Sequence, residues 1–176
     1  YSIAFNDTTG NAGTAVTSGS GSVTTDTTAP TLSSVSLASD NSTSTLAKAG
    51  DDVTLTFTAS EAIGTPVVTF RSGGDAITDG SVVYSNTSGN TWTAVYTANA
   101  SDTDGAVTYS IAFSDTTGNA GTAVTSGSGS VTTDTTAPTL SNVSVTSDNS
   151  TSTLAKAGDD VTLTFTASES ISTPTV

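Results

Sequence analysis

The chain contains a long internal repeat, which restricts the folds available to it more than any other feature. Residues 1–68 recur as residues 109–176, a period of 108 residues, and only 7 of the 68 paired positions differ. Solenoid repeats run about 20 to 50 residues, so a period of this size indicates a row of small domains, each with its own core. Near-identical domains in a row are typical of proteins that set a length or present a surface.

Strict alternation of apolar and polar residues predicts strands with one buried and one solvated face. Residues 53–59 read Val-Thr-Leu-Thr-Phe-Thr-Ala and residues 107–113 read Val-Thr-Tyr-Ser-Ile-Ala-Phe, the period of two expected for half-buried strands. Turn signals rich in Gly, Asn and Asp separate such runs, and no stretch has the spacing of a capped helix. The strands expected in one repeat are 32–38, 53–59, 66–71, 82–85, 91–98, 107–113 and one within 122–133. We therefore predict an all-β fold, a Greek-key β-sandwich of about seven strands.

The sequence Asp-Thr-Thr-Ala-Pro occurs at the end of each repeat and marks the predicted domain boundaries. Proline cannot donate to a strand ladder and biases the residue before it toward extended backbone. The predicted organisation is the C-terminal part of one repeat at 1–29, a complete repeat at 30–137 and the N-terminal part of the next at 138–176. The two partial repeats together lack three central strands. We therefore expect a segment of a longer polypeptide rather than mutual completion between copies.

The composition argues against most kinds of active site. The chain has no His, Cys or Met, and its 16 acidic residues against 3 basic ones give a net charge of -13. The commonest general base, the thiol nucleophile and disulfides are therefore missing. A charge of this sign repels nucleic acid and anionic membrane surfaces, and no apolar run approaches the roughly 20 residues of a spanning helix. We expect neither catalysis nor a nucleic-acid partner nor membrane insertion in this segment, and cations are the expected partners.

Three short motifs together carry a resemblance to a known family. They are the Asp-Thr-Thr-Ala-Pro linker, the Ser60-Glu61 pair after the strand expected at 53–59, and the Asp-Thr-Thr-Gly-Asn hairpin that begins at Asp115. In combination they resemble the bacterial immunoglobulin-like tandem repeats that form the extender regions of giant secreted biofilm adhesins. The resemblance implies immunoglobulin-like modules, a location outside the cell or on the bacterial surface, and calcium ions that stiffen the junctions between repeats.

Topology predicts a cation site without the family. In a seven-strand sandwich the turns that follow strands 53–59 and 107–113 lie at the end where the linker enters. Glu61 and Asp115 should therefore converge on Asp26, with Asn119 close by. Three adjacent carboxylates repel one another unless a cation lies between them. Oxygen ligands of this kind suit Ca²⁺, and Mg²⁺ is the weaker candidate because it demands stricter geometry. The alternative is that these acids only cap turns and keep the surface soluble.

The same reasoning gives further candidate ligands. Asp134 and Glu169 belong to the following junction, and Asp7 and Asn11 to the preceding one. At the other end of the sandwich, Asp102 and Asp104 resemble the opening of a calcium loop that lacks its distant bidentate Glu. We expect Asp40, Asp51 and Asp52, in the connection between strands 32–38 and 53–59, to lie near this second site and near Asp134, the alternative being a solvated acidic loop.

The leading functional hypothesis is a structural one. Tandem modules stiffened by Ca²⁺ would form the stalk of an extracellular adhesin and hold a distal adhesive region away from the cell, with neighbouring repeats of the same chain as partners. One alternative is a repeat that binds carbohydrate or a protein partner and gains avidity by repetition. Another is a subunit of a surface layer or filament built by lateral self-association.

Overall fold

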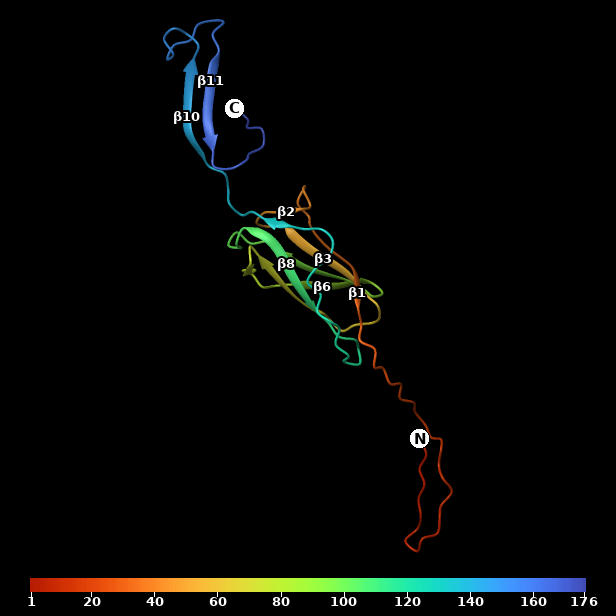
Figure 1. Cartoon of the computed structure of the whole chain (residues 1–176). Helices are drawn as coiled ribbons and strands as arrows, with labels where there is room; N and C mark the ends of the chain where they lie inside the picture. The colour runs from red at the N-terminus through yellow and green to blue at the C-terminus, as the bar shows by residue number, and fades with distance from the viewer.

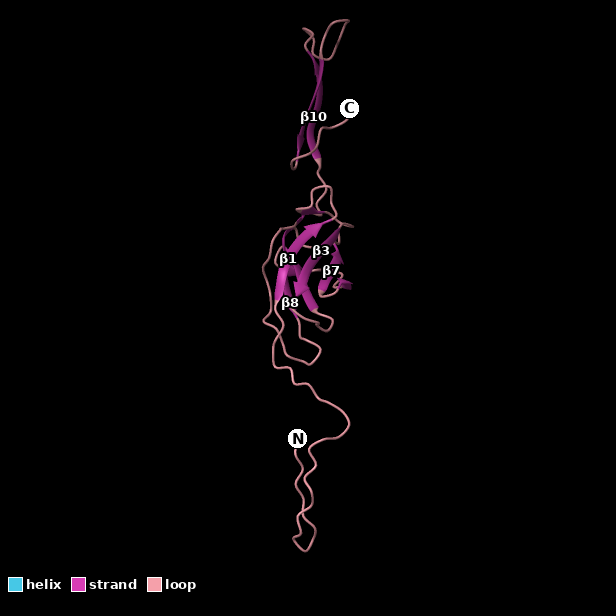
Figure 2. Ribbon diagram, turned by 90° about the vertical axis from the view of Figure 1, so that its right-hand side faces the viewer, coloured by secondary structure: helices cyan, strands magenta, loops and turns pink.

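The computed structural model describes residues 1–176 and contains strands but no helices (Figure 1). The strands are β1 (Leu32–Ser39), β2 (Leu46–Ala47), β3 (Asp52–Ala59), β4 (Val67–Ser72), β5 (Asp75–Ala76), β6 (Val83–Ser88), β7 (Thr91–Thr97), β8 (Gly105–Ala112), β9 (Thr132–Thr133), β10 (Leu140–Ser147) and β11 (Val161–Ala167). The predicted all-β fold is confirmed. In both views the sandwich lies in the middle, with the two partial repeats at opposite ends (Figure 1, Figure 2).

Two sheets face each other in the complete repeat. One has the order β1-β3-β7-β6 and the other the order β2-β9-β8-β4-β5. Neighbouring strands are antiparallel except β2 and β9, which are parallel. β1 leaves the entry linker and β3 runs antiparallel to it, so the turn after β3 lies at the end where the linker enters. The bridge between Ile63 and Asp115 places the turn after β8 at the same end.

The core comes from the alternating rows that the sequence shows. In β3 the inward residues Val53, Leu55 and Phe57 are fully buried, while the Thr residues between them are half-buried on the outer face. The other sheet contributes residues such as Phe70 and Ile111. The rings of Phe70 and Tyr96 meet across the sandwich with their centroids 4.8 Å apart. This apolar layer positions the loops at both ends.

The last strand of the repeat is much shorter than expected. Within 122–133 only β9 is a regular strand, and the preceding Gly-rich segment runs beside β1 through isolated contacts. Ser128 N–H donates to the Val35 carbonyl over 2.8 Å, and Leu37 N–H donates to the Ser128 carbonyl over 3.0 Å. A Cβ at Gly129 would lie 2.2 Å from the Leu37 carbonyl oxygen, so only glycine permits this approach. Glycine is a poor strand former, which explains why a continuous ladder does not form.

The two partial repeats differ from each other. Residues 1–29, expected to hold two strands, form only two isolated bridges, Ile3 to Val16 and Asn6 to Ala12. The other partial repeat forms the hairpin β10–β11, which repeats the register of β1 with β3. Its apolar face lacks a second layer, since Val161 is 62% exposed where the equivalent Val53 is 0% exposed. A lone hairpin is at best marginally stable in water, because it buries little apolar surface.

A bulge interrupts β1 and is repeated in β10. The register shifts between Ser33 and Ser36, and Ser34 adopts a φ of 51° in the left-handed region. The equivalent residue of the next repeat, Asn142, has a φ of 52°. Asn tolerates this conformation better than other residues with a side chain, apart from Asp. One of the seven differences between the copies therefore falls on a strained backbone position.

We expect Ser34→Asn to stabilise the complete repeat by about 0.5 kcal/mol, because Asn lowers the cost of a left-handed residue. Urea unfolding at neutral pH measures the change. Ser36→Asn, on the same strand but outside the left-handed region, serves as control and should not stabilise. A Ser34→Asn variant less stable than the parent would contradict the strain argument.

Candidate metal centre

Three carboxylates from separate parts of the chain meet at the end of the sandwich where the linker enters. Asp26 lies in the linker, Glu61 follows β3 and Asp115 follows β8, and one carboxylate oxygen of each lies within 4.8 Å of the other two. Asp115 is buried, and the other two residues are half-buried. The structure contains no other group of three acidic residues this close. The predicted convergence of these side chains is therefore present in the structure.

Backbone contacts hold the three segments together. Ser60 N–H donates to the Thr31 carbonyl over 2.9 Å, and Thr31 N–H donates to Ser60 Oγ over 3.0 Å, which ties the linker to the turn after β3. The turn after β3 also pairs with the hairpin after β8. Ile63 forms an isolated β-bridge with Asp115, and Gly64 N–H donates to the Ser114 carbonyl. The acids are therefore placed by hydrogen-bonded backbone, not by flexible tails.

Asp115 also organises its own turn. Its Oδ1 accepts the backbone N–H groups of Thr117, Gly118 and Asn119 and the Thr117 hydroxyl, at 2.6 to 3.0 Å. Burial raises the pKa of this carboxyl, but the hydrogen bonds from Asn119, Thr117 and Gly118 outweigh it and hold the pKa below its usual range. Asp115 therefore stays ionised near neutral pH with one oxygen saturated by its own loop.

Asn119 has a different geometry from that of a metal ligand. Its Nδ2 donates to Asp115 Oδ2 over 2.7 Å and faces the Asp26 carbonyl at 3.2 Å. The amide nitrogen, not the amide oxygen, is turned toward the carboxylates. In this structure Asn119 therefore links the linker to the hairpin after β8, a role that the ligand interpretation missed.

The preceding hairpin tests how much of this geometry is local. Asp7 accepts the N–H groups of Thr9 and Asn11 and the Asn11 side-chain amide, at 2.8 to 2.9 Å, although no linker lies against it and all these residues are exposed. Hydrogen bonds from Asn11 and Thr9 lower its pKa. The turn therefore forms from its own sequence. What distinguishes the complete site is the addition of Asp26 and Glu61.

The donor set of the complete site suits a cation. The Asp26 carboxylate receives one hydrogen bond, from Thr28 N–H of its own turn over 3.0 Å, and no protein donor reaches the Glu61 carboxylate. Oxygens with unused lone pairs thus converge where like charges would otherwise repel. Several carboxylate oxygens with a nearby backbone carbonyl are ligands typical of Ca²⁺.

The following junction contains the equivalent acids in part. Asp134 and Glu169 line one open groove together with Asp104 and Thr136. Glu169 Oε1 is shielded from solvent and has no hydrogen-bond partner. A buried carboxylate oxygen without a donor is costly, and a cation bound in the groove would satisfy it.

Asp102 and Asp104 lie at the exit end and are engaged by protein donors. Asp102 is buried and accepts Thr78 N–H over 2.7 Å and Asn99 N–H over 2.9 Å, which fastens the turn before β8. Asp104 accepts donors from Thr135 and Thr136 of the exit linker. Neither belongs to a cluster of three acids, so the geometry gives the suggested second site no support.

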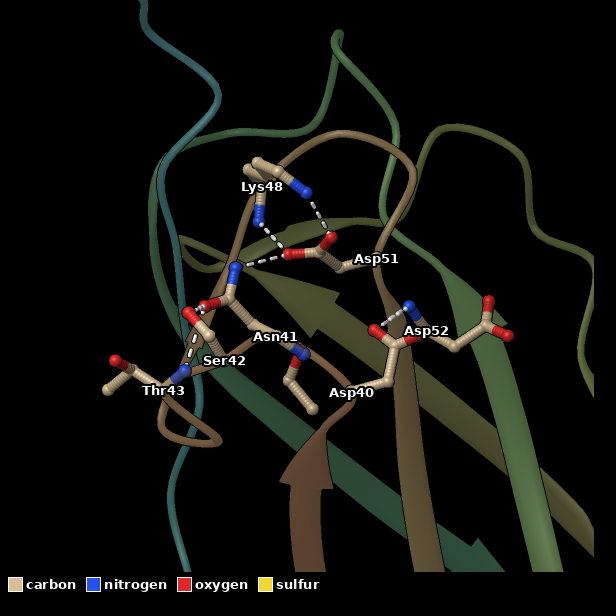
Figure 3. Close-up of polar contacts among 8 residues, drawn as sticks. Asp40, Asn41, Ser42, Thr43, Lys48, Asp51 and Asp52 are labelled. Carbon is tan, nitrogen blue, oxygen red and sulfur yellow. Dashed lines mark hydrogen bonds and ion pairs between the residues drawn. The ribbon is translucent and has the colours of Figure 1, made fainter.

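The connection between β1 and β3 holds a polar network that sequence reasoning missed (Figure 3). Asp51 is buried at its centre and accepts Asn41 Nδ2 over 2.6 Å and Lys48 N–H over 2.9 Å, and it forms an ion pair with Lys48 Nζ. Nearby, Asp40 accepts Asp52 N–H over 2.8 Å. These acids fold their own loop. The repeat carried a signal for this, since it preserves the Asn, Lys and Asp of the network.

Comparison of the chain with protein-family models, with curated proteins and with solved structures finds no match. The structure contains no helix that is long and apolar enough to span a bilayer.

Asp51 makes the free energy of unfolding depend on pH in the acid range. The side-chain hydrogen bond from Asn41, then the bonds and charge of Lys48, lower its pKa to about 2 from the ordinary 3.8. A carboxyl whose pKa is lower in the folded state stabilises the fold at pH values above its unfolded pKa. That stabilisation is lost as the pH falls through the folded-state pKa. We expect Asp51→Asn to cost about 1.5 to 3 kcal/mol at pH 7 and progressively less as the pH falls from 4 to 2, measured by urea unfolding. The exposed Asp79→Asn is the control, and a pH-independent loss for Asp51→Asn would contradict this account.

Proposed function

We propose that this chain is part of an extracellular stalk made of tandem immunoglobulin-like modules whose junctions are stiffened by Ca²⁺. The observation that carries the proposal is the convergence of Asp26, Glu61 and Asp115, because the three come from a linker and from two turns of the module that it enters. A cation bound there would join the linker to the module. A row of such joints is a rod rather than a flexible string.

Three further features support this proposal. The sheet orders β1-β3-β7-β6 and β2-β9-β8-β4-β5 fit an immunoglobulin-like module. The entry and exit linkers lie at opposite ends of the sandwich, so repeats extend in line (Figure 1). The motifs of the linker and of the Asp115 hairpin resemble those of bacterial adhesin extender repeats. A bacterial surface or secreted location, with a distal adhesive region, belongs to the same proposal.

Coupling to calcium would also favour folding outside the cell. An ion that binds the folded state alone stabilises it by mass action, and exterior fluids are rich in calcium. A module that is only marginally stable inside the cell and more stable outside it suits a secreted stalk.

Chelation is the first test. We expect a chelator to lower the melting temperature and to shorten the particle in small-angle scattering, since crowded carboxylates lose their counter-ion and the joint loosens. Calcium should restore both. An unchanged melt and an unchanged radius of gyration would leave only a plain tandem spacer.

Glu61→Gln separates ion binding from turn capping. Without calcium the variant should be at least as stable as the parent, because one repelling charge is gone. With calcium it should gain less stability than the parent, because a ligand is lost. Asp79→Asn, an exposed charge change elsewhere, should keep the parent's full response. Equal calcium responses in Glu61→Gln and parent would favour the capping interpretation.

A further inference from the structure

The same linker sequence lies before the sandwich and after it, and different linker residues are buried in the two places. Ahead of the sandwich, Asp26 is half-buried and Pro30 is buried, while Thr27 and Thr28 are exposed. After the sandwich the pattern reverses. Thr135 is half-buried, while Asp134 and Pro138 are exposed. The module that follows a linker therefore covers its Asp and Pro, and the module that precedes it covers a Thr.

Asp104 belongs to the module that precedes the exit linker, and it makes the contact between that module and the linker. Its Oδ1 accepts Thr135 N–H over 2.7 Å and the Thr135 hydroxyl over 2.9 Å, and its Oδ2 accepts the Thr136 hydroxyl over 2.7 Å. Both oxygens are thus used on two successive linker residues. Asp134 N–H adds a backbone bond to the Ala47 carbonyl over 2.9 Å.

The turn that carries Asp104 is itself fixed. Its neighbour Asp102 is buried and accepts two backbone N–H groups, and Ser72 Oγ donates to the Thr103 carbonyl over 2.8 Å. Gly105 packs against Gly73, where a Cβ would lie 2.9 Å from the Gly73 Cα. A rigid support lets an exposed carboxylate hold a linker in one direction.

We propose that Asp104 is a latch that fixes the direction in which the linker leaves its own module, independently of any cation at the junction. The proposal deepens the stalk function, on which its biological meaning rests, but its hydrogen bonds need no calcium. Each internal linker would then be held twice, by its Thr residues to the module before it and by its Asp and Pro to the module after it.

The two attachments use different atoms and do not compete. Asp104 binds the Thr side chains and the Thr135 N–H, whereas the Asp134 carboxylate accepts only Thr136 N–H of its own turn, over 3.1 Å. Asp134 and Glu169 line the same groove as Asp104. The latch therefore leaves the Asp134 carboxylate beside the Glu that is its expected co-ligand.

Amide hydrogen exchange of the 176-residue chain, followed by NMR, tests the latch directly. We expect Asp104→Ala to speed exchange of the Thr135 N–H at least ten-fold relative to the parent, with and without a calcium chelator. Asp79→Ala is a matched control because both Asp residues stand in a Thr-Asp-Gly sequence and are exposed. An unprotected Thr135 amide in the parent, or one that Asp104→Ala leaves unchanged, would overturn the proposal.

Direction is tested by the distance between spin labels. The chain has no Cys, so Ser85→Cys on β6 and Ser144→Cys on β10, both exposed, label the two sides of the exit linker. In chelator, Asp104→Ala and the double variant Thr135→Val with Thr136→Val should broaden the distance distribution beyond that of the parent. Equal widths in chelator would overturn the latch. A parent whose distance distribution is unchanged by chelator but broadens in Asp104→Ala would support the latch alone, because the exit junction of this chain contains only part of the carboxylate set, Asp134 and Glu169.

Discussion

The sandwich depends on apolar burial between two sheets, because the chain has neither disulfides nor helices to stabilise it. Tyr96, Phe57 and Phe70 are the largest fully buried side chains of that layer. The loops at the two ends are held by the strands that the core packs together. The convergence of carboxylates from a linker and two distant turns is thus a consequence of core packing, and the carboxylates themselves oppose it by their mutual repulsion.

Much of the fold was predictable because a period of two reports burial directly. β3 and β8 carry strict alternation over seven residues, and the structure has both near their expected ranges. The strand expected within 122–133 was harder to predict. Its Gly residues permit a close approach to β1 that depends on tertiary contact, and no periodic pattern marks such a segment.

The candidate site was predictable in outline for topological reasons. Strand direction alone brings the turns after β3 and β8 to the entry end, so the positions of Glu61 and Asp115 followed from the order of strands. Hydrogen-bond assignments did not follow. Whether Asn119 presents its nitrogen or its oxygen, and whether Asp104 meets a cation or a linker Thr, depends on side-chain geometry within about 1 Å, which no spacing rule encodes.

The Gly-rich segment beside β1 has a consequence for how an array of such repeats assembles. Residues 14–30 and 122–138 are identical, and β10 repeats the bulge and most of the sequence of β1. The segment of one repeat therefore fits the first strand of another repeat almost as well as its own. Contact chemistry gives little discrimination between the two pairings. The short connection from β8 discriminates between them, because it gives the segment of the same repeat a far higher effective concentration than that of any neighbour. A longer connection there would favour exchange of strands between adjacent modules.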